Sequence, residues 1–216
     1  MEFLKKPIVL IIVAIIGAAV LFWSTFDRQD DNSIQEEDAT SEEVEIVNLT
    51  NLEPKDFDSV IRTEYAKANE EAKKVNQAYA LAAIEIEIGQ NLTQDEVLSR
   101  YIFTSSKDEE NNWVYTVSQA TGSYIRALIP KSDYFGSPTE MNTKLWQYNY
   151  VTALQLAEEN GGQDFREESD ITGVKLTLRH YGDDNWLMWI IRYDNELTNK
   201  TVYLDASSGD VLDFEE

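Results

Sequence analysis

The sequence begins with a long uncharged segment, from Pro7 to Phe26, that lies between charges of opposite sign. Its length of about 20 residues is what an apolar helix needs to cross a bilayer. Two lysines precede it, whereas Arg28 is the only base in the acidic stretch that follows. Because basic residues stay on the cytoplasmic side, the N-terminus is predicted to be cytoplasmic and the chain after the segment extracytoplasmic. Residues 1–26 are thus predicted to form a cytoplasmic start and a transmembrane anchor, with the span at residues 7–26.

A cleaved signal peptide is the alternative to this anchor. The apolar run is long for a signal peptide, however, and no clear small-x-small cleavage site follows it, so an uncleaved single-pass anchor is favoured. The chain has no cysteine, which excludes a lipid-modified cysteine, disulfides, zinc thiolates and cysteine nucleophiles. An extracytoplasmic domain without disulfides is more typical of a bacterial cell surface than of a eukaryotic secretory protein.

The formal charge of -22 at pH 7 belongs almost entirely to the part predicted to face outward. Such a surface repels the phosphates of nucleic acid, so nucleic acid is excluded as a partner. Residues 27–53 are acidic, poor in aromatic residues and without helical periodicity, which indicates a solvated stalk between anchor and domain.

The chain changes character at Pro54, where apolar residues begin to recur at three- and four-residue steps and continue to Ile86. This spacing predicts one long amphipathic helix with the proline in its first turn. Three segments of strand composition follow, beginning at Leu98, Asn112 and Ser123. A helix followed by an antiparallel meander predicts the α+β class.

The second half of the chain repeats this order at a shift of 73 residues, which places Ala80 on Ala153 and Trp113 on Trp186. Any single pair can agree by chance, but helix, loop, strand and turn agree in order and length over the segment. We therefore predict two tandem units, residues 54–138 and residues 139–216, each with one helix packed on a small antiparallel sheet.

The last fourteen residues, YLDASSGDVLDFEE, bring several oxygen-bearing side chains close together in sequence. Asp205 and Asp210 have a loose likeness to a calcium-binding loop. Apolar residues alternate around a Ser-Gly turn, however, so a closing hairpin is favoured over a metal site.

The remaining residues offer no coherent catalytic set. His180 is the only histidine, which excludes paired-histidine metal sites, and its flanks supply no partner for a nucleophile. With forty acidic residues some close pair is inevitable, so a pair such as Asp183 and Asp184 does not indicate acid-base catalysis. The chain is predicted not to be an enzyme, with no catalytic, cofactor-binding or metal-binding residues.

A strand near the C-terminus is apolar on both faces. Trp186, Met188 and Ile190 are predicted to face the core of the second unit, which leaves the other face to Leu187, Trp189 and Ile191. One helix covers only one face of a small sheet, so something else must cover these three residues. The candidates are the first unit, a second copy of the chain and a partner protein, and the three residues form the predicted interaction face. The oligomeric state is left open.

The C-terminal unit resembles a PepSY domain through the helix YNYVTALQLAEENGG and the closing hairpin around Asp205. The whole chain is similar to the TseB-like cell-wall elongation regulators of Gram-positive bacteria. The matching segments are WVYTVSQATGSYIRALIP, residues 113–130, and LMWIIRY, residues 187–193, and the likeness covers about residues 55–216 and the topology of the anchor. The stalk departs from the family because it is longer and more acidic.

This resemblance implies a non-enzymatic role at the septal or lateral wall, in which the protein binds a penicillin-binding protein in the same membrane. PepSY domains in protease propeptides imply the alternative, the inhibition of an extracytoplasmic peptidase. The family transfers no catalytic residue to this chain.

Overall fold

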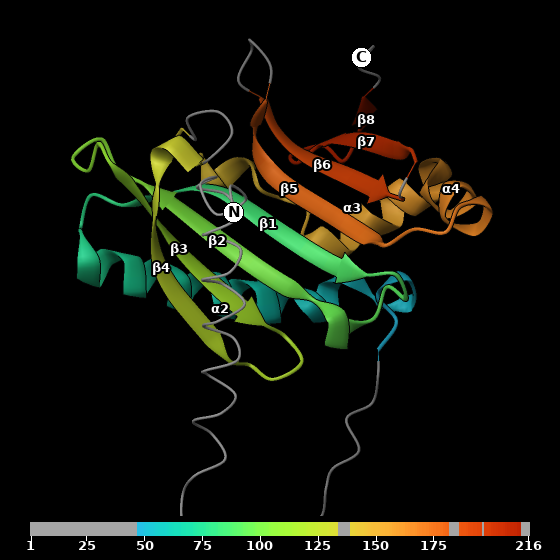
Figure 1. Cartoon of the computed structure of the whole chain (residues 1–216), viewed down its shortest axis with the longest axis horizontal. Helices are drawn as coiled ribbons and strands as arrows, with labels where there is room; N and C mark the ends of the chain where they lie inside the picture. The colour runs from blue at the N-terminus through green and yellow to red at the C-terminus, as the bar shows by residue number, and fades with distance from the viewer. Residues whose placement is uncertain (1–46, 134–138, 182–185, 196, 213–216) are drawn as a thin grey trace, which may run out of the picture. The chain divides into compact units, whose positions relative to one another are not determined.

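The computed structural model describes residues 47–133, 139–181, 186–195 and 197–212 (Figure 1). These residues belong to one compact unit, residues 45–216. The predicted anchor at residues 7–26 and nearly all of the predicted stalk lie outside the described residues. Within the described part of the chain, none of the helices combines the length and the apolarity that a membrane span requires.

The long helix α2, Pro54–Val75, begins as predicted but ends earlier. Pro54 occupies its first turn, and Lys73 and Lys74 lie in its last turn, where cations stabilise the helix dipole. The predicted continuation to Ile86 is wrong, because the chain leaves the helix at Asn76 and forms strand β1, Ala80–Gly89. From Ile84 onward apolar and acidic residues alternate, and this period of two is that of a strand.

Eight antiparallel strands form one sheet in the order β4-β3-β2-β1-β5-β6-β7-β8. This confirms the α+β class. Besides β1, the strands are β2 Leu98–Thr104, β3 Asn111–Ser118, β4 Tyr124–Pro130, β5 Gly173–Tyr181, β6 Trp186–Asp194, β7 Asn199–Asp205 and β8 Val211–Leu212.

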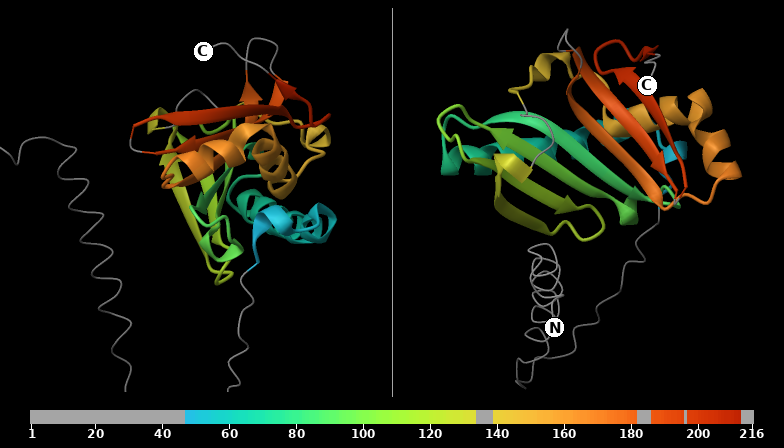
Figure 2. Two further views of the ribbon diagram at one scale, coloured as in Figure 1. Left: turned by 90° about the vertical axis from the view of Figure 1, so that its right-hand side faces the viewer. Right: turned by 45° about the horizontal axis from the view of Figure 1, so that its top comes forward.

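The long helix α2 and the later described helices lie on one face of the sheet, and none of these helices covers the other face (Figures 1 and 2). After α2 they comprise α3 Tyr150–Ala157, the π-helical segment η6 Glu158–Gly162 and α4 Gln163–Glu168. The described part of the chain also contains four single turns of 3-10 helix: η2 Leu49–Asn51, η3 Gln94–Glu96, η4 Lys131–Asp133 and η5 Thr143–Leu145. The buried core between helices and sheet includes Tyr101, Tyr150 and Trp189.

The 73-residue alignment is wrong for β1, because it superposes this strand on helix α3. A different correspondence exists between two turns. The amide of Gly122 donates to the carbonyl of Ser118 at 2.8 Å, and the amide of Gly209 donates to the carbonyl of Asp205 at 2.9 Å. Both glycines have positive φ, 63° and 79°, which favours glycine. A duplication with a boundary at residues 138 and 139 stays a prediction.

The closing hairpin shows what Asp205 does. Its carboxylate accepts hydrogen bonds from the backbone amides of Ser207 and Ser208 at 2.7 and 3.0 Å, and so it holds the turn in place. Partial burial opposes ionisation, but a hydrogen bond from the Ser207 hydroxyl and the two from the backbone amides prevail and lower the pKa of Asp205 below its ordinary value. A search of the described residues finds no cluster of acidic and histidine side chains that could hold a metal ion.

Candidate interaction surface

The predicted interaction face is part of the core. Leu187, Trp189 and Ile191 are 3%, 1% and 0% exposed, and the indole N–H of Trp189 donates to the carbonyl of Tyr148 at 2.8 Å. Helix α3 and the segment before it cover β6 on this side. The prediction that these three residues form an available face is therefore corrected, since the chain covers them itself.

The other face of β6 is the more open one, contrary to the prediction that it faces the core. Trp186 is 46% exposed and Ile190 is half-buried, although Met188 is buried. The 73-residue alignment superposed β3 on β6, whereas β3 and β7 take equivalent places on the two sides of the β1–β5 pair. Side chains alternate between the two faces of a strand, so matching β6 with a strand that is not its counterpart gave no valid basis for choosing the face toward the core.

The helix-free face of the sheet carries a row of ion pairs. Glu85 of β1 lies 3.4 Å from Arg100 on one side and 3.3 Å from Lys175 on the other, and Arg100 also pairs with Glu87 at 2.7 Å. These contacts place long charged side chains over a face that none of the described α-helices covers.

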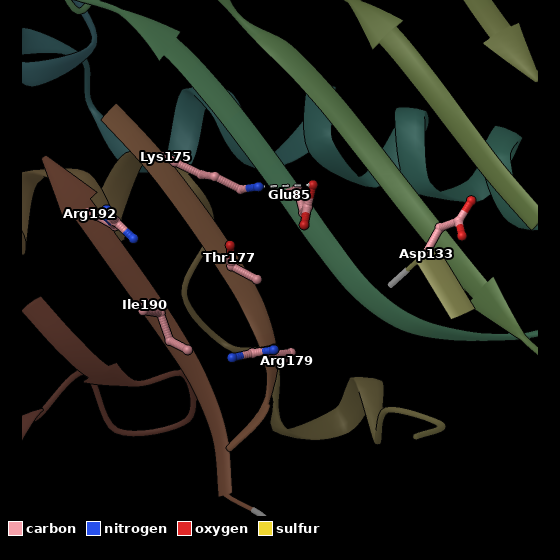
Figure 3. Close-up of a pocket in the computed structure, with 7 residues that line it drawn as sticks. All are labelled: Glu85, Asp133, Lys175, Thr177, Arg179, Ile190 and Arg192. Carbon is pink, nitrogen blue, oxygen red and sulfur yellow. Dashed lines mark ion pairs between the residues drawn. The ribbon is translucent and has the colours of Figure 1, made fainter. Parts of the chain in front are cut away.

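Next to this row is a cleft of about 480 Å³, shown in Figure 3. Arg192 at its rim pairs with Asp194 at 2.7 Å, whereas Nε of Arg179 is buried and has no hydrogen-bond partner among the described residues. The cleft can accommodate an anionic group, but it contains no histidine or cysteine that could serve as a nucleophile or base. Its lining residues are Glu85, Asp133, Lys175, Thr177, Arg179, Ile190 and Arg192.

Glu64 of α2 is the acidic residue whose environment most resembles that of a catalytic acid. Burial raises the pKa of its carboxyl above the ordinary value of 4.5, against the opposing effect of the hydrogen bond that Tyr101 donates at 2.9 Å. Glu64 does not line the cleft, however. It belongs to a buried polar group in which Tyr150 donates to Gln119 at 2.8 Å and Gln119 donates to Ser99 at 3.1 Å. That the chain is not an enzyme stays a prediction.

The raised pKa of Glu64 predicts how the stability of the folded protein depends on pH. The folded state holds the Glu64 proton more tightly than the unfolded state, so the ionised carboxyl lowers stability above its folded pKa. Glu64→Gln keeps an acceptor for Tyr101 without the charge. We expect its urea midpoint at pH 7.5 to equal or exceed that of the parent, and the difference to disappear near pH 4. A clearly lower midpoint at pH 7.5 would show that the fold needs the charged carboxylate.

Strand β4 carries the two most exposed large apolar side chains of the described sheet, Ile125 and Leu128. Tyr124, Ile125 and Leu128 are 42%, 71% and 55% exposed, and β4 is one of the two outer strands. The opposite outer strand, β8, comprises Val211 and Leu212 within the described part of the chain. We call the outer side of β4, residues 124–130, the β4 edge.

The hydrogen-bond pattern shows which backbone groups of β4 have no partner strand among the described residues. The amide of Ser118 donates to the carbonyl of Ser123, and the amide of Lys131 donates to the carbonyl of Glu110, so the odd-numbered positions bond to β3. In an antiparallel pair the intervening residues point their N–H and C=O groups the other way. Tyr124, Arg126 and Leu128 therefore present theirs at the β4 edge. Pro130 is also an even-numbered position and faces away from β3, so its missing N–H costs no hydrogen bond to that strand.

Sequence reasoning treated SYIRALIP as an ordinary strand and missed this surface. The available signal was that both alternating sets of side chains, those at Tyr124 and Leu128 and those at Ile125 and Ile129, contain large apolar residues. A strand of this kind is either fully covered or an exposed apolar edge, and the strand order decides between the two.

Comparison with known proteins gives little further information. No family model matches the chain, and no curated protein matches it. A crystal structure of a candidate lipoprotein from Clostridium difficile 630 aligns with a TM-score of 0.44 and 14% sequence identity, over 70% of this chain and 91% of that chain. The function is therefore inferred from the chain's own residues.

Proposed function

We propose that this protein is a non-enzymatic, membrane-anchored extracytoplasmic binding protein that regulates peptidoglycan synthesis by binding a penicillin-binding protein. In this proposal residues 7–26 span the cell membrane once, with the N-terminus in the cytoplasm. Two tandem PepSY-like units form the extracytoplasmic part. The observation that supports a binding role is the β4 edge, an exposed apolar strand at the border of an otherwise well-packed sheet.

A shared membrane would make a modest interface sufficient. Two proteins anchored in one membrane meet at a raised effective concentration, so even a short docking strand can give substantial occupancy. The acidic stalk would provide reach along the membrane surface, since charged linkers repel themselves and extend.

The test is to purify the full-length protein in mild detergent from its native membrane and to label the eluate with a fluorescent penicillin. We expect a labelled penicillin-binding protein that is at least tenfold enriched over a purification of an unrelated single-pass protein with the same tag. Absence of any labelled protein, in a preparation that retains the folded bait, would contradict the proposal.

Inhibition of an extracytoplasmic peptidase is the second candidate, and the same β4 edge favours it. Extended segments commonly bind other proteins by adding a strand to an exposed sheet edge. In this case the full-length protein added in detergent would reduce peptidase activity of the membrane fraction in proportion to its concentration. Unchanged proteolysis would rule this candidate out.

A further inference from the structure

The β4 edge has the backbone groups that strand addition requires. Tyr124, Arg126 and Leu128 each direct an N–H and a C=O away from β3, and the run ends at Pro130, which lacks the donor. A partner strand that pairs here would extend the eight-stranded sheet by one strand. Backbone hydrogen bonds would supply affinity and the side chains specificity.

The side chains at these positions are arranged to receive apolar neighbours. The ring of Tyr124 stacks on Tyr115 of β3 with centroids 5.1 Å apart, and this contact holds it flat on the helix side of the sheet. Leu128 is more than half exposed on the same side. A cross-strand neighbour at either position would bury these surfaces, and such pairs stabilise sheets by about 0.2–1 kcal/mol each.

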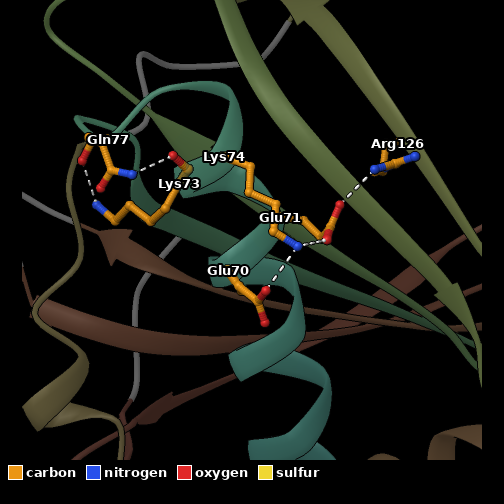
Figure 4. A network of polar contacts seen from close by, with 6 residues as sticks. All are labelled: Glu70, Glu71, Lys73, Lys74, Gln77 and Arg126. Atoms are coloured by element: carbon orange, nitrogen blue, oxygen red, sulfur yellow. Dashed lines mark hydrogen bonds and ion pairs between the residues drawn. The ribbon is translucent and has the colours of Figure 1, made fainter.

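The charges beside the edge differ in sign from the charge of the whole chain. Arg126 pairs with Glu71 of α2 at 2.6 Å, and Lys74 pairs with both Glu70 and Glu71, as Figure 4 shows. The ammonium of Lys67 lies 4.4 Å from the centre of the Tyr124 ring, whereas Lys73 points away from the edge and donates to the carbonyl of Gln77. Three bases against two acids leave one net positive charge beside the edge, in a chain of net charge -22. A partner strand with an acidic residue near Arg126 would complement it.

A second copy of this chain is a poorer occupant. The antiparallel self-pairing that uses all three outward-facing residues would set Tyr124 against Leu128 and would put the two Arg126 side chains directly opposite each other. Like charges in directly opposite positions destabilise a strand pair. The net charge of -22 on each copy adds a repulsion that a different partner need not have.

We propose that the β4 edge binds an extended strand of a different protein in antiparallel orientation, with apolar residues opposite Tyr124 and Leu128 and an acidic residue opposite Arg126. This proposal rests on the proposed function, because it assigns the docking mode of the same binding protein. It requires no rearrangement of the described fold, since the outward-facing groups are already aligned.

The test uses photo-crosslinking from the full-length protein in its native membrane. A photoreactive phenylalanine analogue replaces Ile125 at the β4 edge or, as a control, Leu197, which is 96% exposed in the turn between β6 and β7. Leu128→Pro removes an outward-facing N–H and leaves the bonds to β3 intact, and Leu128→Ala is its matched control. Arg126→Glu reverses the charge without proline and decides the outcome if Leu128→Pro does not fold.

We expect position 125 to give an adduct with a protein whose linked segment is extended and contains an acidic residue. The adduct yield should fall at least tenfold with Leu128→Pro relative to Leu128→Ala, and also with Arg126→Glu. Adducts from position 197 alone, or a yield insensitive to both variants, would overturn the docking mode but not the proposed function. An adduct between two copies would overturn the choice of partner. If neither position gives an adduct and no penicillin-labelled protein co-purifies, both proposals fail.

Discussion

Replacing Trp189 by alanine is expected to lower the free energy of unfolding by about 3–5 kcal/mol, the usual cost of removing a buried tryptophan side chain. Trp189 is 1% exposed and among the largest fully buried side chains of the core. Its substitution leaves a cavity beneath α3 and removes one of the two indole donors to the carbonyl of Tyr148, which keeps the hydrogen bond from Trp146 at 2.9 Å. Urea unfolding of the full-length protein in detergent, followed by tryptophan fluorescence and circular dichroism, measures the effect.

Trp186→Ala is the matched control, because it lies on the same strand and is 46% exposed. It should cost about 1 kcal/mol or less, as is usual for substitutions at the surface. If Trp189→Ala left stability unchanged and weakened a complex instead, the burial described here would be wrong and the originally predicted interaction face would be restored.

The difference between these two tryptophans also shows where sequence reasoning reached its limit. Alternation along β6 correctly identified two sets of side chains, but the choice of the set that faces the helices depended on an internal alignment. That alignment equated β3 with β6. Alternation carries no information about which side of a sheet the helices occupy. The wrong alignment therefore assigned the wrong set of β6 side chains to the helix-covered side.

The end of α2 shows a second limit of prediction from the sequence. Tyr79, Ala82 and Ile86 continue the helical spacing of the residues before them, although they lie in or next to β1. The stretch from Ala80 to Ile84 is apolar throughout because it forms part of a central strand that is buried on both faces. A fully apolar run is compatible with the period of a helix and with that of a strand. By contrast β2, β3 and β4 begin at or next to the predicted residues, where polar turns separate them clearly.

The β4 edge could not be predicted because exposure at an edge is a property of strand order. The residues of β4 and those of a buried strand differ little in composition. The pairing of β1 with β5 joins the strands β1–β4 and β5–β8 into one sheet and leaves β4 at the outside. The closing hairpin around Asp205 was easier to predict, since glycine and short polar residues specify a turn locally.

Replacing Arg166 by methionine is expected to cost about 3 kcal/mol, because it leaves the buried carboxylate of Glu158 without its partner. Nε and one terminal nitrogen of Arg166 lie 3.1 and 2.6 Å from the same oxygen of Glu158, whose side chain is 6% exposed. In a straight helix these residues, eight positions apart, would be separated by about 12 Å along the axis. They meet because Gly161, with a φ of 88°, breaks the helix within η6 and turns α4 back.

A double-mutant cycle with Glu158→Gln distinguishes the loss of the pair from a loss of packing. Methionine retains much of the apolar stem of arginine, so the cost of Arg166→Met should come mainly from the uncompensated carboxylate. The double variant Arg166→Met with Glu158→Gln should therefore recover at least half of the lost stability. Arg192→Met is the control, since Arg192 and its partner Asp194 are 53% and 38% exposed and such pairs contribute at most about 1 kcal/mol. If the double variant were no more stable than Arg166→Met alone, Arg166 would stabilise the turn by packing, and the pairing with Glu158 would not be the reason that α4 folds back.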